Sequence, residues 1–133
     1  MTIPCEIAVK SVIPAVKALI TQELLEKHGL KQEEVAKILG ISQSAVSKYT
    51  RKTRGQAINI EQMEEIQIPI NNIVTLILDG GNSRTEFLKL FCEICEIIRE
   101  EGLMCEFCQK TNPTIRMEEC DFCDGKYVPK KRR

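Results

Sequence analysis

The sequence predicts an all-α protein. Apolar residues recur every three or four positions over much of the chain, which is the spacing that places them on one face of a helix. Residues that stop and start helices, above all Gly40 and Ser42, divide this pattern into short segments. A βαβ pattern is missing. We therefore expect a helical bundle whose core is aliphatic, because aromatic residues are scarce and Trp is absent.

The first helix is expected to begin near Ser11, a residue type that caps helix N-termini. Pro14 would then lie in the first turn, where its missing N–H matters least. A mostly apolar face follows at helical spacing, and His28-Gly29 ends the helix. That face consists of Ile13, Val16, Leu19, Ile20, Glu23 and Leu24. The sequence leaves open whether residues 5–10 extend this helix or form an arm.

Two short helices flank a tight turn in the next segment. The first covers residues 32–39 and ends at Gly40, and the second covers residues 43–51, with Ser42 as its N-cap. Gly55 closes the unit. The residues expected to face inward are Val35, Ile38 and Leu39 on the first helix, with Ala36 at a close contact, and Ala45, Val46 and Tyr49 on the second.

Two further helices and a cysteine-rich segment complete the expected organisation. Pro69 can open a helix over residues 70–78, and a capping box at residues 83–86 can open another that runs to Glu101. The latter is apolar on most of its circumference, so it needs cover on two sides, from this chain or from a second copy. A loop-rich segment containing cysteines then runs to Gly125.

Charge is distributed unevenly along the 133 residues, although the net charge is zero. Residues 31–54 carry six basic side chains against two acidic ones, whereas residues 55–125 carry five against fourteen. The tail over residues 126–133 is basic again. A local basic patch is what a phosphate backbone meets, so overall neutrality argues only weakly against nucleic acid.

The second short helix has the features of a recognition helix. It is short enough for the major groove of DNA, and its polar residues Gln43, Ser44 and Ser47 are expected to project outward. Glutamine can bind adenine through two hydrogen bonds, and serine can donate or accept at several base edges. We therefore expect these three residues to read bases. The residues expected to hold phosphates are Gln32, Lys48, Arg51, Lys52 and Arg54.

This segment resembles the lambda-repressor/Cro-like helix-turn-helix family. The matching residues are Gln32, Val35, Ala36, Leu39, Gly40, Ile41, Ser42, Ala45, Val46 and Ser47, followed by residues 52–55. The resemblance implies a five-helix DNA-binding domain over roughly residues 8–80. The opening residues 4–7, with the late cysteines, further resemble a group of archaeal predicted transcriptional regulators. Two positions depart from the pattern: Lys31 stands where the family usually has Ser or Thr, and Cys108 stands where many relatives have His.

Three Cys-x-x-Cys pairs lie in the last third of the chain. They are Cys92 and Cys95, Cys105 and Cys108, and Cys120 and Cys123. The last four have the spacing of a zinc ribbon or knuckle, and four thiolates also suit an iron–sulfur cluster, so the two cofactors are supported equally. The first pair is interpreted equally well as apolar core, and a metal-free dithiol switch is a third possibility.

The expected location is the cytoplasm. No apolar run reaches the length of a membrane span, and the first 20 residues lack the basic region of a signal peptide. Seven cysteines in a chain that is not exported indicate metal ligands or redox thiols rather than disulfides.

The hypothesis that follows is a transcriptional regulator that binds double-stranded DNA. A DNA-binding domain over residues 1–80 would precede a dimerisation helix and metal lobe over 81–125 and a basic tail over 126–133. We expect a homodimer, because one short recognition helix reads too few base pairs. The helices over 69–78 and 84–101 are its expected interface. We expect no enzyme activity, small-molecule substrate or membrane partner. The rival hypothesis is a protein-interaction adaptor with structural zinc.

Overall fold

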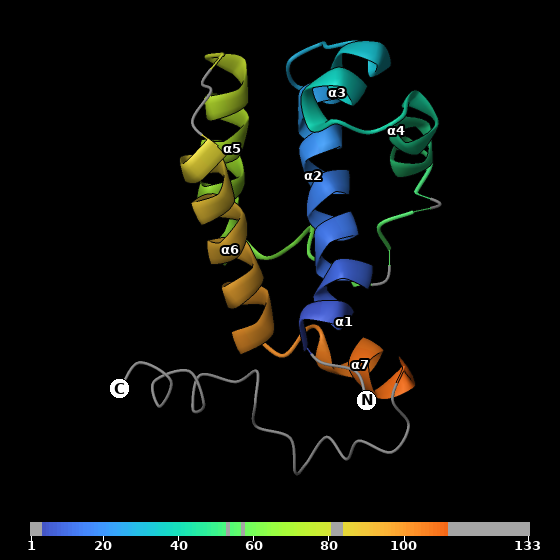
Figure 1. Cartoon of the computed structure of the whole chain (residues 1–133), viewed down its shortest axis with the longest axis vertical. Coiled ribbons are helices and arrows are strands. Elements are labelled where there is room, and N and C mark those ends of the chain that lie inside the picture. Colours follow the sequence, from blue (N-terminus) through green and yellow to red (C-terminus); the bar gives the residue numbers. More distant parts are fainter. Residues whose placement is uncertain (1–3, 53, 57, 81–83, 112–133) are drawn as a thin grey trace.

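Helices make up all the regular structure in the computed structural model, which describes residues 4–52, 54–56, 58–80 and 84–111. The all-α prediction is confirmed for this part of the chain. The helices in order are α1 (Pro4–Lys10), α2 (Val12–Glu26), α3 (Gln32–Leu39), α4 (Gln43–Thr50), the 3₁₀ turn η1 (Glu64–Ile66), α5 (Gln67–Leu78), α6 (Arg84–Glu100) and α7 (Cys105–Thr111). Figure 1 shows α2 at the centre, with α3 across its upper end, α4 on one side and α5 and α6 on the other. In the described ranges, no helix is long and apolar enough to cross a membrane.

Helices α1 and α2 meet at Ser11. As predicted, α2 begins directly after Ser11 and has Pro14 in its first turn. The N-cap role predicted for the serine side chain is wrong, because the Ser11 hydroxyl donates to the Ile7 carbonyl at 2.7 Å and caps nothing. A helical turn already precedes this residue, and its last carbonyls offer the buried hydroxyl a nearby acceptor. Residues 5–10, for which the sequence allows either an extension of this helix or an arm, belong to the separate helix α1.

The turn between α3 and α4 has the expected geometry. Gly40 is left-handed, with φ of 66° and ψ of 34°, which ends α3 at little steric cost because glycine has no Cβ. Val35 and Ala36 are buried as predicted. The inward orientation predicted for Ile38 is wrong, since 43% of this residue is exposed. Helix α3 is only eight residues long, so its contact with α2 and α4 covers a narrow face that does not reach this position.

After α4 the chain turns back onto α2. Gly55, with φ of 80°, lies so close to α2 that a Cβ on it would be 2.8 Å from the Pro14 carbonyl oxygen. Ile58 and Ile60 then enter the core. This return fixes the segment that follows α4 against α2.

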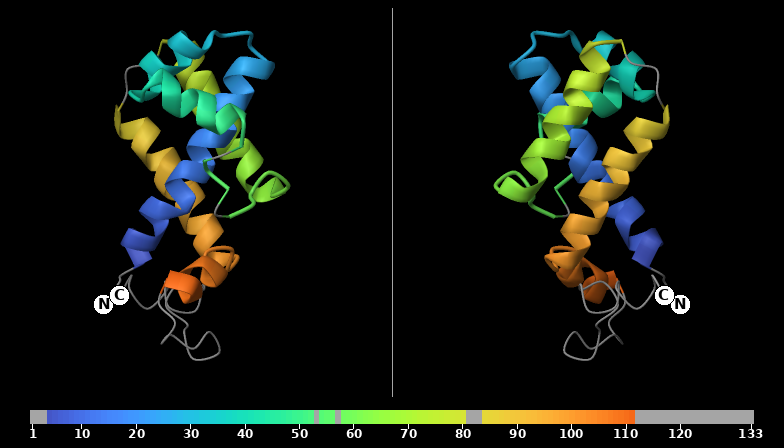
Figure 2. Two further views of the ribbon diagram at one scale, coloured as in Figure 1. Left: turned by 90° about the vertical axis from the view of Figure 1, so that its right-hand side faces the viewer. Right: turned by 90° about the vertical axis from the view of Figure 1, so that its left-hand side faces the viewer.

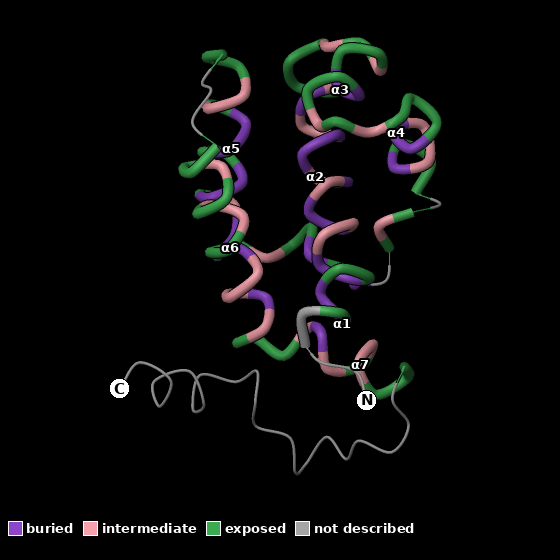
Figure 3. The backbone as a smooth tube through the Cα atoms, in the orientation of Figure 1, coloured by how far each residue is buried: buried purple, intermediate pink, exposed green. Residues whose placement is uncertain are grey.

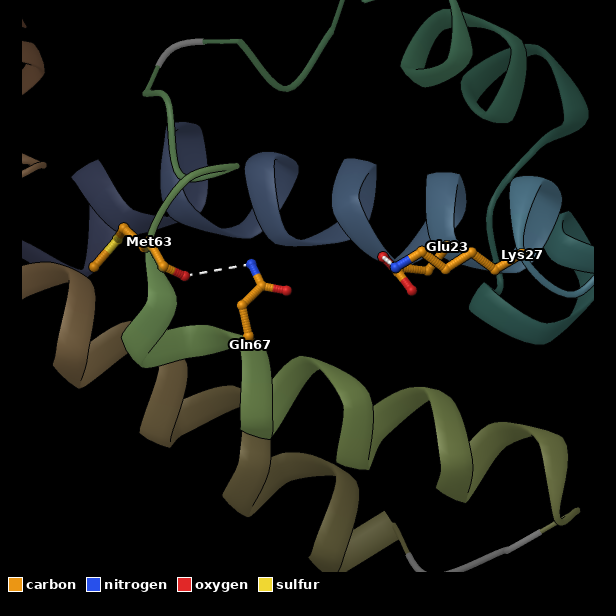
Figure 4. A network of polar contacts seen from close by, with 4 residues as sticks. All are labelled: Glu23, Lys27, Met63 and Gln67. Carbon is orange, nitrogen blue, oxygen red and sulfur yellow. Dashed lines mark hydrogen bonds and ion pairs between the residues drawn. The ribbon is translucent and has the colours of Figure 1, made fainter.

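The 3₁₀ turn η1 leads directly into α5. The Gln67 side chain donates to the Met63 carbonyl at 3.3 Å and ties this junction together (Figure 4). The same view shows the 2.9 Å ion pair that joins Glu23, in the last turn of α2, to the C-cap residue Lys27. The predicted start of this helix at residue 70 is wrong by three residues, because α5 begins at Gln67 and has Pro69 in its first turn. The first turn tolerates proline throughout, so the residue does not identify the first position.

Helix α6 begins at residue 84 and ends at residue 100, one residue earlier than predicted. The Ser83 capping box lies outside the described residues. Ile94 and Ile98 are fully buried, whereas Leu88 and Cys92 are exposed, so the broad apolar surface of this helix is only partly covered. The loop predicted after it is wrong for residues 105–111, which form α7; the remainder to residue 125 is outside the described ranges.

One hydrophobic core joins these helices. Its buried side chains come from α1, α2, α3, α4, α5 and α6, together with Met104 before α7. Figure 3 shows buried positions along α2 and α5 and in the second half of α6, whereas α3, α4 and the first half of α6 carry many exposed positions. Helix α6 therefore packs into the same core as the first 80 residues.

Candidate nucleic-acid interface

Helix α4 is held by its apolar face and presents a polar one. Ala45, Val46 and Tyr49 are buried against α2 and α3, and the alanine packs with Ala18 of α2 in a small cluster. Two alanines in contact let the helix axes approach closely, which fixes how α4 lies on the bundle. The opposite face is therefore directed away from the core (Figure 3).

The three residues predicted to read bases all lie on the polar face. Gln43 and Ser44 are exposed in the first turn of α4, and Ser47 is half-buried one turn later. Residues three and four apart are neighbours on a helix, so the three side chains form one short stripe at the N-terminal half of α4. A stripe of hydrogen-bonding groups at this end is what a helix needs to contact base edges in the major groove.

Ser42 fixes the start of this helix. Its backbone is extended, with φ of −77° and ψ of 156°, and its hydroxyl accepts a hydrogen bond from the Ala45 N–H at 3.0 Å. This is the predicted N-cap, which satisfies an otherwise unpaired amide. Because Gly40 and Ser42 define both sides of the turn, the direction in which α4 leaves α3 is set by local geometry.

The start of α3 lacks such a cap. Lys31 occupies the N-cap position, and its side chain carries only donor hydrogens, so it cannot accept a bond from an amide. Glu34 supplies the reverse bond, accepting from the Lys31 N–H at 3.0 Å. The departure from the family pattern at this position therefore removes one half of a capping box and keeps the other.

Gln32 has less favourable surroundings for a phosphate than the other candidates. It is half-buried at the first position of α3, where helix amides point outward. Two exposed carboxylates, Glu33 and Glu34, lie in the same turn and oppose a phosphate at this end. The helix amides therefore favour a phosphate at this end of α3, whereas the two carboxylates repel it.

Three cations follow directly after α4. Arg51 is exposed at the C-terminal end of the helix, and Arg54 is exposed next to the glycine that contacts α2. Lys52 lies between them in the left-handed region, with φ of 60°, and its ammonium is 3.5 Å from the Glu61 carboxylate. Exposed ion pairs of this kind contribute little, so this lysine can exchange its partner for a phosphate.

The contact of Glu61 with Lys52 is not predicted from the sequence. It depends on the return of the chain over α2, and no local pattern signals it. The half-buried Lys48 completes the group of predicted phosphate-binding residues, at the border between the polar face and the core. The structure thus brings the predicted residues of 43–54 together around one helix and its C-terminal end.

Tyr49 keeps the buried face of α4 uncharged. Burial raises the pKa of its phenol above the usual 10.0, and the nearby Arg54 guanidinium opposes this shift in part. The phenol therefore stays neutral at physiological pH. The positive charge of this region then comes from side chains that are exposed or half-buried: Lys48, Arg51, Lys52 and Arg54.

The cysteines lie elsewhere. Cys92 and Cys95 are on α6, exposed and half-buried, and Cys105 and Cys108 are half-buried on α7; all four are thiols. Within the described ranges, no three His, Cys, Asp or Glu side chains are grouped to hold a metal ion. The pairs on α6 and α7 are therefore not combined into one site here. Cys120 and Cys123 lie outside the described residues.

Comparison with known families identifies the same segment. Residues 22–66 match the sequence model of the helix-turn-helix family, in the lambda-repressor/Cro-like form. The match covers the end of α2, all of α3 and α4, the return segment and η1. No curated protein and no solved structure matches the chain.

Proposed function

We propose that this protein is a sequence-specific regulator of transcription, which binds double-stranded DNA as a homodimer in the cytoplasm. The observation that carries the proposal is the polar stripe of α4: Gln43, Ser44 and Ser47 lie on the outer side of a helix whose other face is buried. The helix-turn-helix match over residues 22–66 supports DNA as the ligand. The function is one of binding, and we assign it no reaction.

Dimerisation is proposed because α4 has only eight residues and reads few base pairs by itself. Helices α5 and α6 pack against each other, and they leave Ile68, Leu78 and Leu88 exposed on their outer sides. These residues are candidates for contact with a second copy. A two-fold dimer would present its two α4 helices to half-sites about one turn of DNA apart.

In vitro selection from a pool of random duplexes tests the proposal. The expected result is a palindromic consensus with half-sites roughly 10 base pairs apart, whose binding weakens steeply as salt rises. Failure to enrich any sequence, with retention that is insensitive to salt, would favour the adaptor hypothesis. A single, non-palindromic site would contradict the dimer.

We expect Gln43→Ala to weaken binding to the selected duplex about tenfold, because a bidentate side-chain contact to a base contributes on the order of 1–3 kcal/mol. Affinity for random duplexes should not change, since phosphates supply that binding. The measurement is fluorescence anisotropy with both duplexes. Gln109→Ala, at an exposed position on α7, is the matched control and should have no effect. An equal loss of affinity for both duplexes would show that Gln43 does not read a base.

We further propose a zinc ion or an iron–sulfur cluster held by Cys105, Cys108, Cys120 and Cys123. The described half of this set fits: Cys105 and Cys108 are one helical turn apart on α7, and thiolates suit both cofactors. Such a centre would stabilise the segment that follows α6, and its loss under oxidants or metal limitation would signal redox or metal status.

Metal analysis of protein purified without oxygen tests this assignment. Stoichiometric zinc or iron is expected, and Cys105→Ser/Cys108→Ser should lose it almost entirely because half of the ligands are removed. The matched control is Cys92→Ser/Cys95→Ser, which should keep the metal. Loss from the control with retention in the α7 variant would reverse the assignment.

A further inference from the structure

Helix α6 crosses α2 (Figure 2). Residues of α6, α1, α2 and the end of α3 line an apolar groove. Its volume is about 500 Å³, within the range of roughly 300–1,000 Å³ that is typical of small-molecule sites. The apolar lining includes Val9, Ile13, Leu39, Phe87, Leu88 and Phe91. Val9 and Leu88 are 64% and 45% exposed, so apolar surface is open at this groove.

The charges of the groove have one sign. Of the described residues that line it, Lys17 and Arg99 are charged, both positively, and no carboxylate is among them. Both are half-buried, and Lys17 has no ion-pair partner among the described residues. A cation beside apolar walls attracts an anion more strongly than a cation in bulk water does, because the local dielectric constant is lower.

We propose that this groove binds a single-chain apolar molecule that ends in a carboxylate. The aliphatic part would lie against Phe87 and Phe91, whose ring centroids are 5.4 Å apart on adjacent turns of α6. The carboxylate would lie at Lys17. Apolar burial would supply affinity, and the Lys17 ammonium would select the sign of the charged end.

The position of the groove connects it with the helix-turn-helix. Leu39 is the last residue of α3 and directly precedes the Gly40 turn, while the other residues that line the groove come from α1, α2 and α6. A bound molecule would therefore contact the DNA-binding unit and α6 together. The regulatory part of the proposal, that the ligand alters DNA affinity, rests on the proposed function; ligand binding itself does not.

Titration calorimetry with the full chain and three probes of equal length tests the ligand class. Decanoate should bind saturably with one site per chain, decanol about tenfold more weakly and decylammonium more weakly still, because a charge-assisted contact contributes on the order of tenfold or more. Equal affinity for the three probes, or no saturable binding of decanoate, would overturn the proposal.

Two pairs of variants locate the site. Lys17→Met should remove the preference for decanoate over decanol and leave decanol binding unchanged, whereas Lys37→Met on α3 should change neither. Val9→Glu should abolish binding of decanoate; this position on α1 is already exposed, so the fold tolerates the change. Ile38→Glu, at an exposed apolar position on α3 outside the groove, is the control. If the groove variants behave like their controls, the ligand binds elsewhere.

Anisotropy with the selected duplex tests the regulatory part. Decanoate should change DNA affinity, and saturating duplex should change decanoate affinity by the same factor, as linkage requires. Decanoate binding without this coupling would refute regulation, but it would still support the ligand site. Decanoate binding by a chain that selects no duplex would refute the proposed function, and it would likewise still support the ligand site.

Discussion

Replacing Arg51 and Arg54 with glutamine should reduce affinity for random duplexes about a hundredfold in a dimeric complex and lower the salt slope by about two per protomer. The reason is that both guanidinium groups are exposed directly after α4, the proposed recognition helix, where they would release counterions on meeting phosphates. Glutamine keeps the length and polarity of the side chains. The measurement is anisotropy over a series of salt concentrations.

The matched control removes the same charge elsewhere. Arg84→Gln/Lys89→Gln changes two exposed cations at the start of α6, which lies across α2 from α4 (Figure 1). This variant should keep the salt slope of the wild-type protein. If both double variants lose affinity to the same degree, net charge governs binding, and residues 51–54 have no special position on the DNA.

The turn between α3 and α4 could be predicted because its determinants are local. Gly40 ends one helix through its own backbone freedom, and Ser42 starts the next through a hydrogen bond to a residue three positions later. The inner and outer faces of α4 follow from helical spacing once those two residues are placed. Most of the candidate site was therefore visible in the sequence.

The remainder depends on contacts between distant segments. Ile38 has the spacing of an inward residue, yet no neighbour covers it, because the length of α3 and its packing decide which face is buried. Likewise, the pairing of Lys52 with Glu61 requires the return of the chain over α2. The groove between α6 and the α1–α2 pair arises only when helices about 80 residues apart in the sequence are brought together.

Gly55 places the segment that follows α4 directly against α2. Gly55→Ala should lower the free energy of unfolding by about 3 kcal/mol, since left-handed strain of about 1–2 kcal/mol is added to a similar cost of overpacking. A Cβ at this position would be 2.8 Å from the Pro14 carbonyl oxygen and 2.9 Å from the Ala18 Cβ. Both atoms belong to α2 and are fixed by the helix backbone, so the return segment has to move instead.

Gly80→Ala separates the two contributions. Gly80 also has a left-handed backbone, with φ of 69°, but a Cβ there meets no atom within 4 Å. It should therefore cost only the strain, about 1 kcal/mol. Urea unfolding of both variants, followed by circular dichroism, gives the comparison. Equal losses would mean that the segment after α4 is not pressed against α2. A larger loss at Gly55, together with weaker binding of random duplexes, would connect this contact with the placement of Arg51 and Arg54, because the displaced segment carries both.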